Sequence, residues 1–232
     1  MILSPHPEIK INKQTFGLEQ APILVVDNFV QSPEWLVAQA AQQHYVPHSP
    51  FYPGNSADTP EAYKHFFLNC LQDLIKEVFD VRSDLRFSGC RFSHVSTEPS
   101  ALQLLQRIPH FDSLGKNDLA AVHYLFKEDL GGTSFYRHRK TGFEYIDESR
   151  KIEYFRSLEG ENDGPNMPKA TDGYINGDTA LYERIAEQHG IFNRLVIYRR
   201  NSLHSGSIRN ELFYGDKAIS KRLTINSFID CY

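Results

Sequence analysis

Short apolar runs with a period of two occupy the chain from residue 86 onward, and this pattern constrains the fold more than any other feature. Side chains of a β-strand alternate between its two faces, so such runs predict half-buried strands. Gly, Asn, Asp and Ser residues separate the runs, as expected for turns between antiparallel strands. The predicted strands cover residues 87–95, 102–107, 120–126, 133–138, 195–199 and 222–229.

The first 85 residues have a different character, in which helix and loop predominate. Residues 61–79 carry apolar side chains at intervals of three and four, which predicts an amphipathic helix. Ser32 and Pro33 resemble a helix start, so residues 35–44 are predicted as a second helix. Residues 22–27 form a short buried strand, and the proline-rich residues 47–60 are predicted as loop.

Helices early and strands late favour an α+β fold in a single domain, residues 1–232. A mainly helical part (1–85) is expected to pack on the outer sheet of an antiparallel barrel or jelly roll (86–232). A two-domain division near residue 85 is the alternative. A charged insertion at about residues 139–190 is a candidate lid or specificity element. Within it, Asp178 is predicted to cap a short helix that ends before Gly190.

Composition excludes several classes of protein. The formal net charge of -4 argues against a dedicated surface for nucleic acid or anionic membranes. No apolar run is long enough to predict a membrane span, and the N-terminus shows no export signal. Cys70, Cys90 and Cys231 are odd in number and scattered, which favours reduced thiols and a cytoplasmic location. The oligomeric state stays open.

His110 and Asp112 are the first residues that point to chemistry. In an extended segment they project to the same side, where an imidazole and a carboxylate can share one metal ion. The triplet alone has a simpler explanation, because a surface histidine beside an aspartate occurs by chance. A second histidine, His204, follows the strand 195–199 and its turn and precedes Gly206, so it is expected at the mouth of the barrel.

The strand 222–229 carries the second signal, because its two faces differ in an unusual way. Leu223, Ile225 and Ile229 occupy one face, and Arg222, Thr224 and Asn226 the other. Directing an arginine into a barrel costs several kcal/mol unless an anion meets the guanidinium. No carboxylate nearby in the sequence is an obvious partner, so the anion is expected to be a ligand.

In this order, the motifs resemble those of the Fe(II)- and 2-oxoglutarate-dependent oxygenases of the double-stranded β-helix fold. Two histidines and one carboxylate form the facial triad of non-haem Fe(II) oxygenases. Tyr124-Leu125 followed by Gly131-Gly132-Thr133 is similar to the second strand and Gly-Gly turn of the prolyl-hydroxylase-like branch. The stretches 25–29, 52–54 and 192–198 look like those of a functionally uncharacterised bacterial group, and the resemblance covers about residues 22–230.

The resemblance implies a set of roles. His110, Asp112 and His204 would bind Fe(II). Arg222 would pair with the distal carboxylate of 2-oxoglutarate, with Tyr124 and Thr224 as hydroxyl donors. Dioxygen would be consumed, and hydroxylation of an amino acid, peptide or small metabolite is the expected outcome. The interval from His204 to Arg222 contains an extra polar loop at 209–217, and this makes Arg209 the fallback partner of the anion.

Substrate contacts are the least defined part of the sequence. The candidates are Thr133, Phe135, Arg137 and His138. A solvated hairpin end is the plainer interpretation of the basic cluster there. His123 alternates with Tyr124 and is therefore expected to face the outer layer, away from the metal.

Two other classes of function fit part of the pattern. A cupin-type metal-dependent isomerase or hydrolase would keep His110, Asp112 and His204 but would have no need of Arg222. A non-catalytic protein could retain the fold without turning over 2-oxoglutarate.

Overall fold

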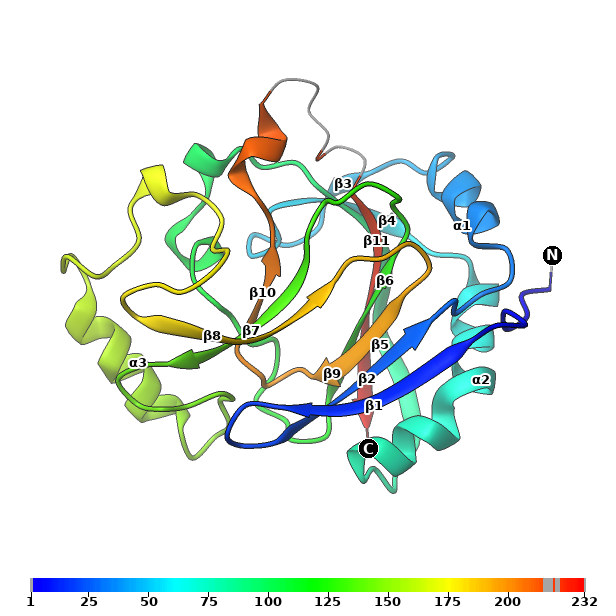
Figure 1. Ribbon diagram of the computed structural model, residues 1–232, viewed down its shortest axis with the longest axis horizontal. Helices are drawn as coiled ribbons and strands as arrows, with labels where there is room; N and C mark the ends of the chain where they lie inside the picture. The colour runs from blue at the N-terminus through cyan, green and yellow to red at the C-terminus, as the bar shows by residue number, and fades with distance from the viewer. Residues whose placement is uncertain (1, 215–218, 220–221, 232) are drawn as a thin grey trace.

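The computed structural model describes residues 2–214, 219 and 222–231, and it places two antiparallel sheets face to face with helices around them (Figure 1). The helices are α1 (Pro33–Ala40), α2 (Glu61–Phe79) and α3 (Lys151–Glu161). The described residues also contain the short 3-10 turns η1 (Pro99–Ala101), η2 (Leu104–Gln106), η3 (Ala170–Asp172) and η4 (Asn210–Phe213).

The larger sheet has eight strands in the order β1-β2-β9-β6-β11-β5-β4-β3, and the smaller sheet has the order β10-β7-β8. The strands of the larger sheet are β1 (Lys10–Phe16), β2 (Ala21–Asp27), β3 (Val46–Pro47), β4 (Gly54–Asp58), β5 (Leu85–Val95), β6 (Leu119–Tyr124), β9 (Leu195–Arg199) and β11 (Leu223–Cys231). Those of the smaller sheet are β7 (Gly132–His138), β8 (Tyr182–His189) and β10 (His204–Ser207).

The N-terminal part is built into the larger sheet. Strand β2 pairs with β9, and β4 pairs with β5, so segments from both sides of residue 85 share one set of hydrogen bonds. Besides the helices α1 and α2, the N-terminal part therefore contributes β1 to β4, which all lie before residue 85. The sequence predicted β2 as residues 22–27, whereas β1 lacked a clear period-two signal because it is an exposed edge strand, and β4 because it is short.

Strand β11 has the two faces that its sequence predicts. Leu223, Ile225 and Ile229 belong to the core beneath the helices. Thr224 lies opposite Tyr124 on one neighbouring strand and Ser93 on the other, so these three side chains form one row on the opposite face. The face toward the smaller sheet is thus the polar one.

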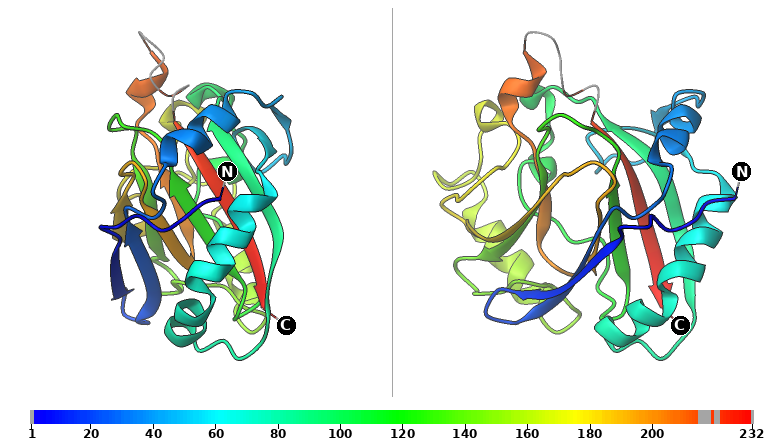
Figure 2. Two further views of the ribbon diagram at one scale, coloured as in Figure 1. Left: turned by 90° about the vertical axis from the view of Figure 1, so that its right-hand side faces the viewer. Right: turned by 45° about the vertical axis from the view of Figure 1, so that its right-hand side comes forward.

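Helix α2 has the bounds that its periodicity predicts, and it covers the outer face of the larger sheet (Figure 2). It ends where Asp80 adopts a left-handed conformation, with a φ of 50°, and the Val81 amide donates to the Lys76 carbonyl. Its buried side chains are Tyr63, Phe66, Phe67, Leu71, Ile75 and Phe79. They share one apolar core with β2, β5, β9 and β11, which anchors the helix to the sheet.

A second apolar core fills the space between the two sheets. It contains Phe16, Val25, Tyr124 and Val196 from the larger sheet and Phe135 from the smaller one. The rings of Phe16 and Phe135 lie 4.3 Å apart between their centroids. This packing makes a sandwich whose inner space is filled at one end and open at the other, where the candidate site lies.

Several predicted elements differ from those observed. Residues 102–107 form η2 and its flanks instead of a strand, and residues 47–60 contain β3 and β4 as well as loop. The helix predicted at 35–44 starts at Pro33 and already ends at Ala40, and Ser32 stands at its N-cap without a side-chain capping bond. In β4, Gly54 lies so close to the His94 carbonyl that a Cβ would not fit. This strand therefore forms because it pairs with β5, and not because of its own sequence pattern.

The segment 139–190 is only partly an insertion. The helix predicted after Asp178 is wrong, because Tyr182–His189 forms β8 and pairs with β7 along its whole length. Asp178 accepts a hydrogen bond from the Arg184 amide within this hairpin instead of capping a helix. Helix α3 lies in the same segment and was not predicted.

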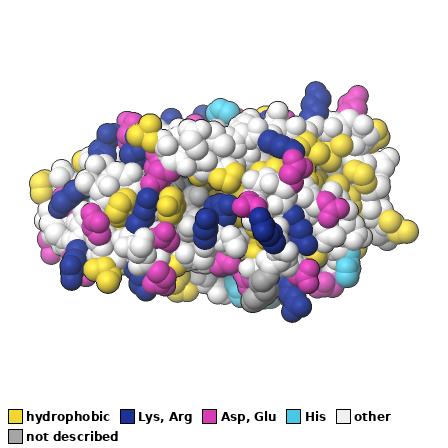
Figure 3. All heavy atoms as spheres, turned by 90° about the horizontal axis from the view of Figure 1, so that it is seen from below, with side chains coloured by type: hydrophobic (Ala, Val, Ile, Leu, Met, Phe, Trp, Pro, Cys, Tyr) yellow, Lys and Arg dark blue, Asp and Glu magenta, His cyan; other side chains and the backbone are white. Residues whose placement is uncertain are grey.

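Charges of both signs are interspersed on the face seen in Figure 3. Across the described residues, no helix has the length and apolar character that crossing a membrane would require. Cys70, Cys90 and Cys231 are free thiols. The polar loop expected at 209–217 begins with η4, and its residues 215–217 lie outside the described residues.

His123 lies on the outer face of β6, as expected from its alternation with Tyr124. Its Nε2 lies 3.1 Å from Asn193 Oδ1, and the Tyr63 hydroxyl lies 3.2 Å from its Nδ1. Because the amide oxygen only accepts, Nε2 carries the proton and Nδ1 accepts from Tyr63. Desolvation lowers the pKa of His123 to about 4, and the Asn193 hydrogen bond only partly opposes this shift.

We expect this imidazole to make the fold acid-sensitive. An unfolded histidine titrates near pH 6.5, whereas folded His123 stays neutral down to about pH 4. The unfolded state therefore binds the extra proton, and the free energy of unfolding falls by up to about 3 kcal/mol as the pH decreases between these values. His123→Gln should flatten this slope in denaturant titrations at several pH values. The same change at exposed His65 should leave the slope intact, and equal slopes in both variants would contradict the assignment.

Candidate metal centre

The main chains of His110 and His204 hydrogen-bond to each other in both directions. Each amide donates to the carbonyl of the other residue at 2.9 Å, which makes an isolated antiparallel bridge. Residues paired in this way project their side chains to the same side. The two imidazole centroids consequently lie 4.4 Å apart.

Asp112 completes the cluster two residues beyond His110. Its amide donates to the Arg200 carbonyl at 2.8 Å, which fixes the segment beside the turn before His204. Its carboxylate lies 3.8 Å from His110 Nε2 and 3.4 Å from His204 Nε2. One ligand atom from each of the three residues lies within 4.8 Å of the others. The structure thus brings together the three residues that the sequence singled out.

Hydrogen bonding and burial keep both imidazoles suited to bind a cation. His204 Nδ1 lies 2.9 Å from the Ser202 carbonyl, which only accepts, so the lone pair of Nε2 faces Asp112. His110 keeps 49% of its side-chain surface open and lines the cavity. Desolvation by the protein around it, followed by the charge of His204, lowers the pKa of His110 to about 4, although Asp112 opposes this.

Arg222 lines the same cavity, which has a volume of about 300 Å³. It is only 5% exposed. Its Nε donates to the Leu130 carbonyl at 3.0 Å, and Nη2 donates to the Gly132 carbonyl at 2.9 Å. Within the described residues no carboxylate lies within 4.0 Å of its guanidinium. The Phe126 ring lies 5.6 Å from its Cζ, but neither this ring nor the two carbonyls neutralise the charge, which favours an anionic ligand in the cavity.

The two hydroxyl donors expected beside Arg222 are placed differently. The Tyr124 hydroxyl and Thr133 Oγ1 share a hydrogen bond of 2.7 Å, and Thr133, not Tyr124, lines the cavity. Thr224 Oγ1 contacts the Ser93 carbonyl at 3.5 Å and does not line the cavity either. Both residues sit in the row of side chains behind the cavity wall.

Tyr52 supplies a hydroxyl that the sequence did not single out as a site residue. It lines the cavity, and its buried hydroxyl has no hydrogen-bond partner in the described part of the chain. Burial raises the pKa of Tyr52, and the positive charge of Arg222 opposes that shift. Polar contacts from the side chains of Ser93, Asn226 and Thr224 oppose the rise in the pKa as well. In the sequence, the Tyr-Pro-Gly triplet at 52–54 is the signal that could have pointed to this residue.

The remaining candidates for substrate contacts lie elsewhere, with Thr133 as the exception. Phe135 is packed in the core between the sheets. Arg137 forms ion pairs with Glu144 at 2.5 Å and Glu183 at 2.9 Å.

His138 is buried against Tyr154 and Tyr182, and its Nδ1 lies 2.9 Å from Thr141 Oγ1. Arg209, the fallback anion partner, is half-exposed and pairs with Asp129 at 3.2 Å, outside this cavity. Neither residue therefore offers a charge to a ligand bound beside Arg222.

We expect Asp112→Asn to weaken binding of a divalent metal by at least about 100-fold, because the substitution removes the only anionic ligand of the set. Titration calorimetry with Co(II) or anaerobic Fe(II) measures the effect. Asp73→Asn, on the exposed face of α2, is the matched control and should bind as the unaltered protein does. Unchanged affinity in Asp112→Asn would remove the cluster as a metal site.

The chain was compared with curated proteins, with solved structures and with sequence models of protein families. A search of curated proteins found no match. Among solved structures, the chain is similar to HygX from Streptomyces hygroscopicus with nickel and 2-oxoglutarate bound, at 11% identity over 91% of this chain and 83% of that one, with a TM-score of 0.52. A second HygX structure, with hygromycin B also bound, has 11% identity over 95% and 82% of the chains, with a TM-score of 0.48. The non-heme alpha ketoglutarate dependent epimerase SnoN from nogalamycin biosynthesis has 11% identity over 86% and 72%, with a TM-score of 0.47.

The first of these similarities shows a shared overall fold. A sequence model of one protein family matches residues 7–229, nearly the whole chain. The protein therefore belongs to the family of unknown function DUF6445.

Proposed function

We propose that this protein is an Fe(II)- and 2-oxoglutarate-dependent dioxygenase, a single domain of double-stranded β-helix architecture in the prolyl-hydroxylase-like branch. One observation carries the proposal: a two-histidine, one-carboxylate cluster lines one cavity together with a buried guanidinium that has no carboxylate partner among the described residues. The fold shared with HygX, whose structure holds nickel and 2-oxoglutarate, supports it.

The donor set fits the proposed metal. Two imidazole nitrogens and one carboxylate oxygen suit Fe(II) and leave coordination positions for cosubstrate and dioxygen. With Fe(II) bound, such a centre would supply oxidation by dioxygen. One oxygen atom would be taken up as 2-oxoglutarate becomes succinate and CO2, and the other would enter the substrate as a hydroxyl group. The substrate is proposed to be an amino acid, a peptide or a small metabolite.

The protein's own residues position the cosubstrate. The free edge of the Arg222 guanidinium can pair with the distal carboxylate, a geometry to which arginine is suited. The Tyr52 hydroxyl faces the same place and can donate a further hydrogen bond.

Anaerobic addition of Fe(II) and 2-oxoglutarate to the metal-free protein tests the proposal. We expect a visible metal-to-ligand charge-transfer band, and Arg222→Gln should weaken 2-oxoglutarate binding by about 10- to 100-fold while metal affinity is kept. Arg209→Gln, a half-exposed arginine outside the cavity, is the control and should bind normally. A folded protein that binds metal but gives no band with 2-oxoglutarate would instead favour a cupin-type isomerase or hydrolase.

A pair of tyrosine variants tests which hydroxyl serves the cosubstrate. Tyr52→Phe should raise the dissociation constant of 2-oxoglutarate about tenfold, the effect of one hydrogen bond to a charged group. Tyr124→Phe should have a smaller effect, because its hydroxyl reaches Thr133 and not the cavity. The same anaerobic titration measures both, and the reverse order would return the role to Tyr124.

A further inference from the structure

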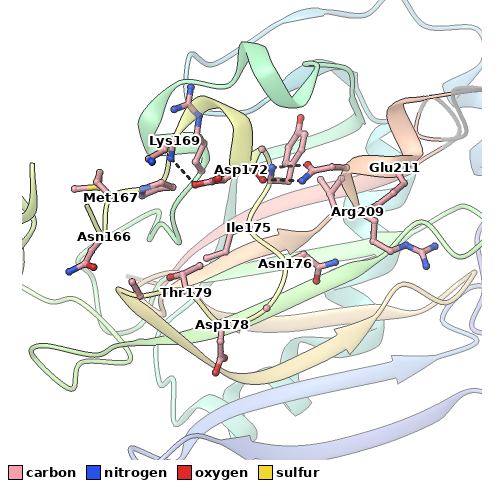
Figure 4. A pocket seen from close by; sticks show the side chains of 18 of the residues that line it. Asn166, Met167, Lys169, Asp172, Ile175, Asn176, Asp178, Thr179, Arg209 and Glu211 are labelled. Atoms are coloured by element: carbon pink, nitrogen blue, oxygen red, sulfur yellow. Dashed lines mark hydrogen bonds between the residues drawn. The ribbon is translucent and has the colours of Figure 1, made fainter. Parts of the chain in front are cut away.

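The cavity drawn in Figure 4 has a volume of about 710 Å³, but none of the three residues of the metal cluster lines it. Its walls come mainly from residues 165–169, 172–180 and 208–211. Cations and acids line it in equal number, Arg107, Lys169 and Arg209 against Asp172, Asp178 and Glu211. A substrate that reacts at the metal must therefore bind in the smaller cavity, beside the cluster.

The larger sheet supplies the floor of that smaller cavity. Arg91 on β5 lies opposite Asn226 on β11 in the strand register, and Val122 on β6 continues the same row. In the next row, Gly89 lies opposite Phe228. All five residues line the cavity, and each keeps part of its surface open. The guanidinium of Arg91 and the amide of Asn226 are therefore the polar side chains that these two rows offer to a substrate.

Phe228 connects this floor to the metal cluster. The guanidinium of Arg200 lies over its ring, with Cζ 4.7 Å from the ring centroid. The Arg200 carbonyl accepts a hydrogen bond from the amide of Asp112, one of the three cluster residues. The row that follows Arg91 thus lies on the side of the metal ligands, so a small molecule held at Arg91 can extend toward them over Phe228.

Two of the three nitrogens of the Arg91 guanidinium hold it in place. Nε donates to Ser56 Oγ at 3.0 Å, and Nη1 donates to Asp58 Oδ1 at 2.5 Å. Ser56 is buried and lines the same cavity, so its bond keeps the guanidinium on the cavity floor. Nη2 donates to no other group in the described part of the chain. The side chain is therefore fixed in direction while one nitrogen stays available for a ligand.

Asp58 leaves much of the positive charge of Arg91 unneutralised. The Asp58 side chain is 82% exposed and does not line the cavity, whereas the Arg91 side chain is 24% exposed. Water and salt screen an ion pair with so exposed a partner, and such pairs contribute little free energy. An anion inside the cavity would meet the guanidinium from a side that water reaches less. Arg91 can therefore attract a second anion without losing Asp58.

The charges and the size of the smaller cavity limit what can bind there. Among the described residues, the only arginine or lysine side chains that line it are Arg91 and Arg222. Under the proposed function, Arg222 takes the distal carboxylate of 2-oxoglutarate, which leaves one cation for the substrate. The volume of about 300 Å³ lies at the lower end of the range for ligand sites and has to hold the cosubstrate as well. These limits fit a small substrate with one negative charge.

We propose that Arg91 binds the carboxylate of the substrate, with Asn226 as a second donor, and that the substrate is a small monocarboxylic acid such as a free amino acid. One guanidinium N–H and one amide N–H match the two oxygens of a carboxylate. The rest of the acid lies over Gly89 and Phe228, toward the metal ligands. This assignment names the substrate class for the proposed function and rests on it.

The arginine Nε–H signals in proton–nitrogen NMR spectra test the proposal without turnover. The protein is loaded with Zn(II) and saturating 2-oxoglutarate, so that the Arg222 site is filled, and Arg91→Gln identifies the Arg91 signal. The probes are the proteinogenic amino acids with neutral side chains and the straight-chain acids from acetate to hexanoate, each compared with its primary amide. We expect at least one acid to shift the Arg91 signal and its amide to leave that signal unchanged.

Variants separate the charge of Arg91 from its part in the fold. Arg91→Gln should weaken calorimetric binding of that acid at least about tenfold. Asp58→Asn should strengthen it at least about twofold, because the competing carboxylate is lost. Arg156→Gln, the same change on the exposed face of α3, should leave the affinity unchanged. Binding of no acid, equal binding of acid and amide, or a loss in Asp58→Asn as large as in Arg91→Gln would overturn the assignment.

The assignment and the proposed function can fail separately. If Fe(II) and 2-oxoglutarate give no charge-transfer band, the proposed function fails, whereas the acid titration of the Zn(II) protein still shows whether Arg91 takes a carboxylate. If the band forms but Arg91→Gln weakens binding of 2-oxoglutarate and not of the acid, the proposed function stands. Arg91 then belongs to the cosubstrate site, and the substrate assignment is overturned.

Discussion

The reciprocal main-chain pair of His110 and His204 is the interaction on which the site depends. It joins a loop that follows η2 to the first residue of β10, two segments far apart in the sequence. Because the pair fixes both main chains, it also fixes Asp112, whose amide is held by the Arg200 carbonyl on the same turn. Three side chains thus converge without any hydrogen bond between the two imidazole rings. A cluster positioned by main-chain bonds keeps its ligand atoms free for a metal.

The stretch 192–198 has a structural role that its resemblance did not reveal. Arg194 forms a two-pronged ion pair with Asp27, at 2.5 and 3.0 Å. Asn193, in a left-handed conformation with a φ of 64°, exchanges side-chain hydrogen bonds with both the amide and the carbonyl of Val30. The carbonyl of Asn193 also accepts from the Phe29 amide. These bonds attach the end of β2 and the residues after it to the start of β9. They leave neither the Asn193 nor the Arg194 side chain available for catalysis.

The elements that the sequence predicted well are those with a strong local pattern of apolar residues. Helix α2 and strand β11 have strong periodicity of 3.6 and 2, and their bounds or faces agree with the structure. His110, Asp112 and His204 were found from residue chemistry and from a family resemblance, and the structure brings them together.

The features that the sequence did not reveal depend on contacts between residues far apart in the chain. Strand β8 forms because β7 offers it a partner, although its own residues give no clear strand signal. Tyr52 escaped notice because only the folded chain shows that its loop returns to Arg222. Tyr124 was assigned by resemblance, and the rotation of its ring toward Thr133 cannot be read from sequence.

The Gly131-Gly132 turn connects the fold to the anion site by a steric argument. A Cβ at Gly131, whose φ is +85°, would overlap the Ser207 carbonyl, and a Cβ at Gly132 would overlap the Gln188 carbonyl. Glycine is therefore needed for β10 and β8 to approach the start of β7 on either side. The same turn presents the Gly132 carbonyl, and Leu130 before it presents its own, to the Arg222 guanidinium. Two carbonyl dipoles orient this cation but do not neutralise it, so the packing of the smaller sheet leaves a positive charge directed into the cavity.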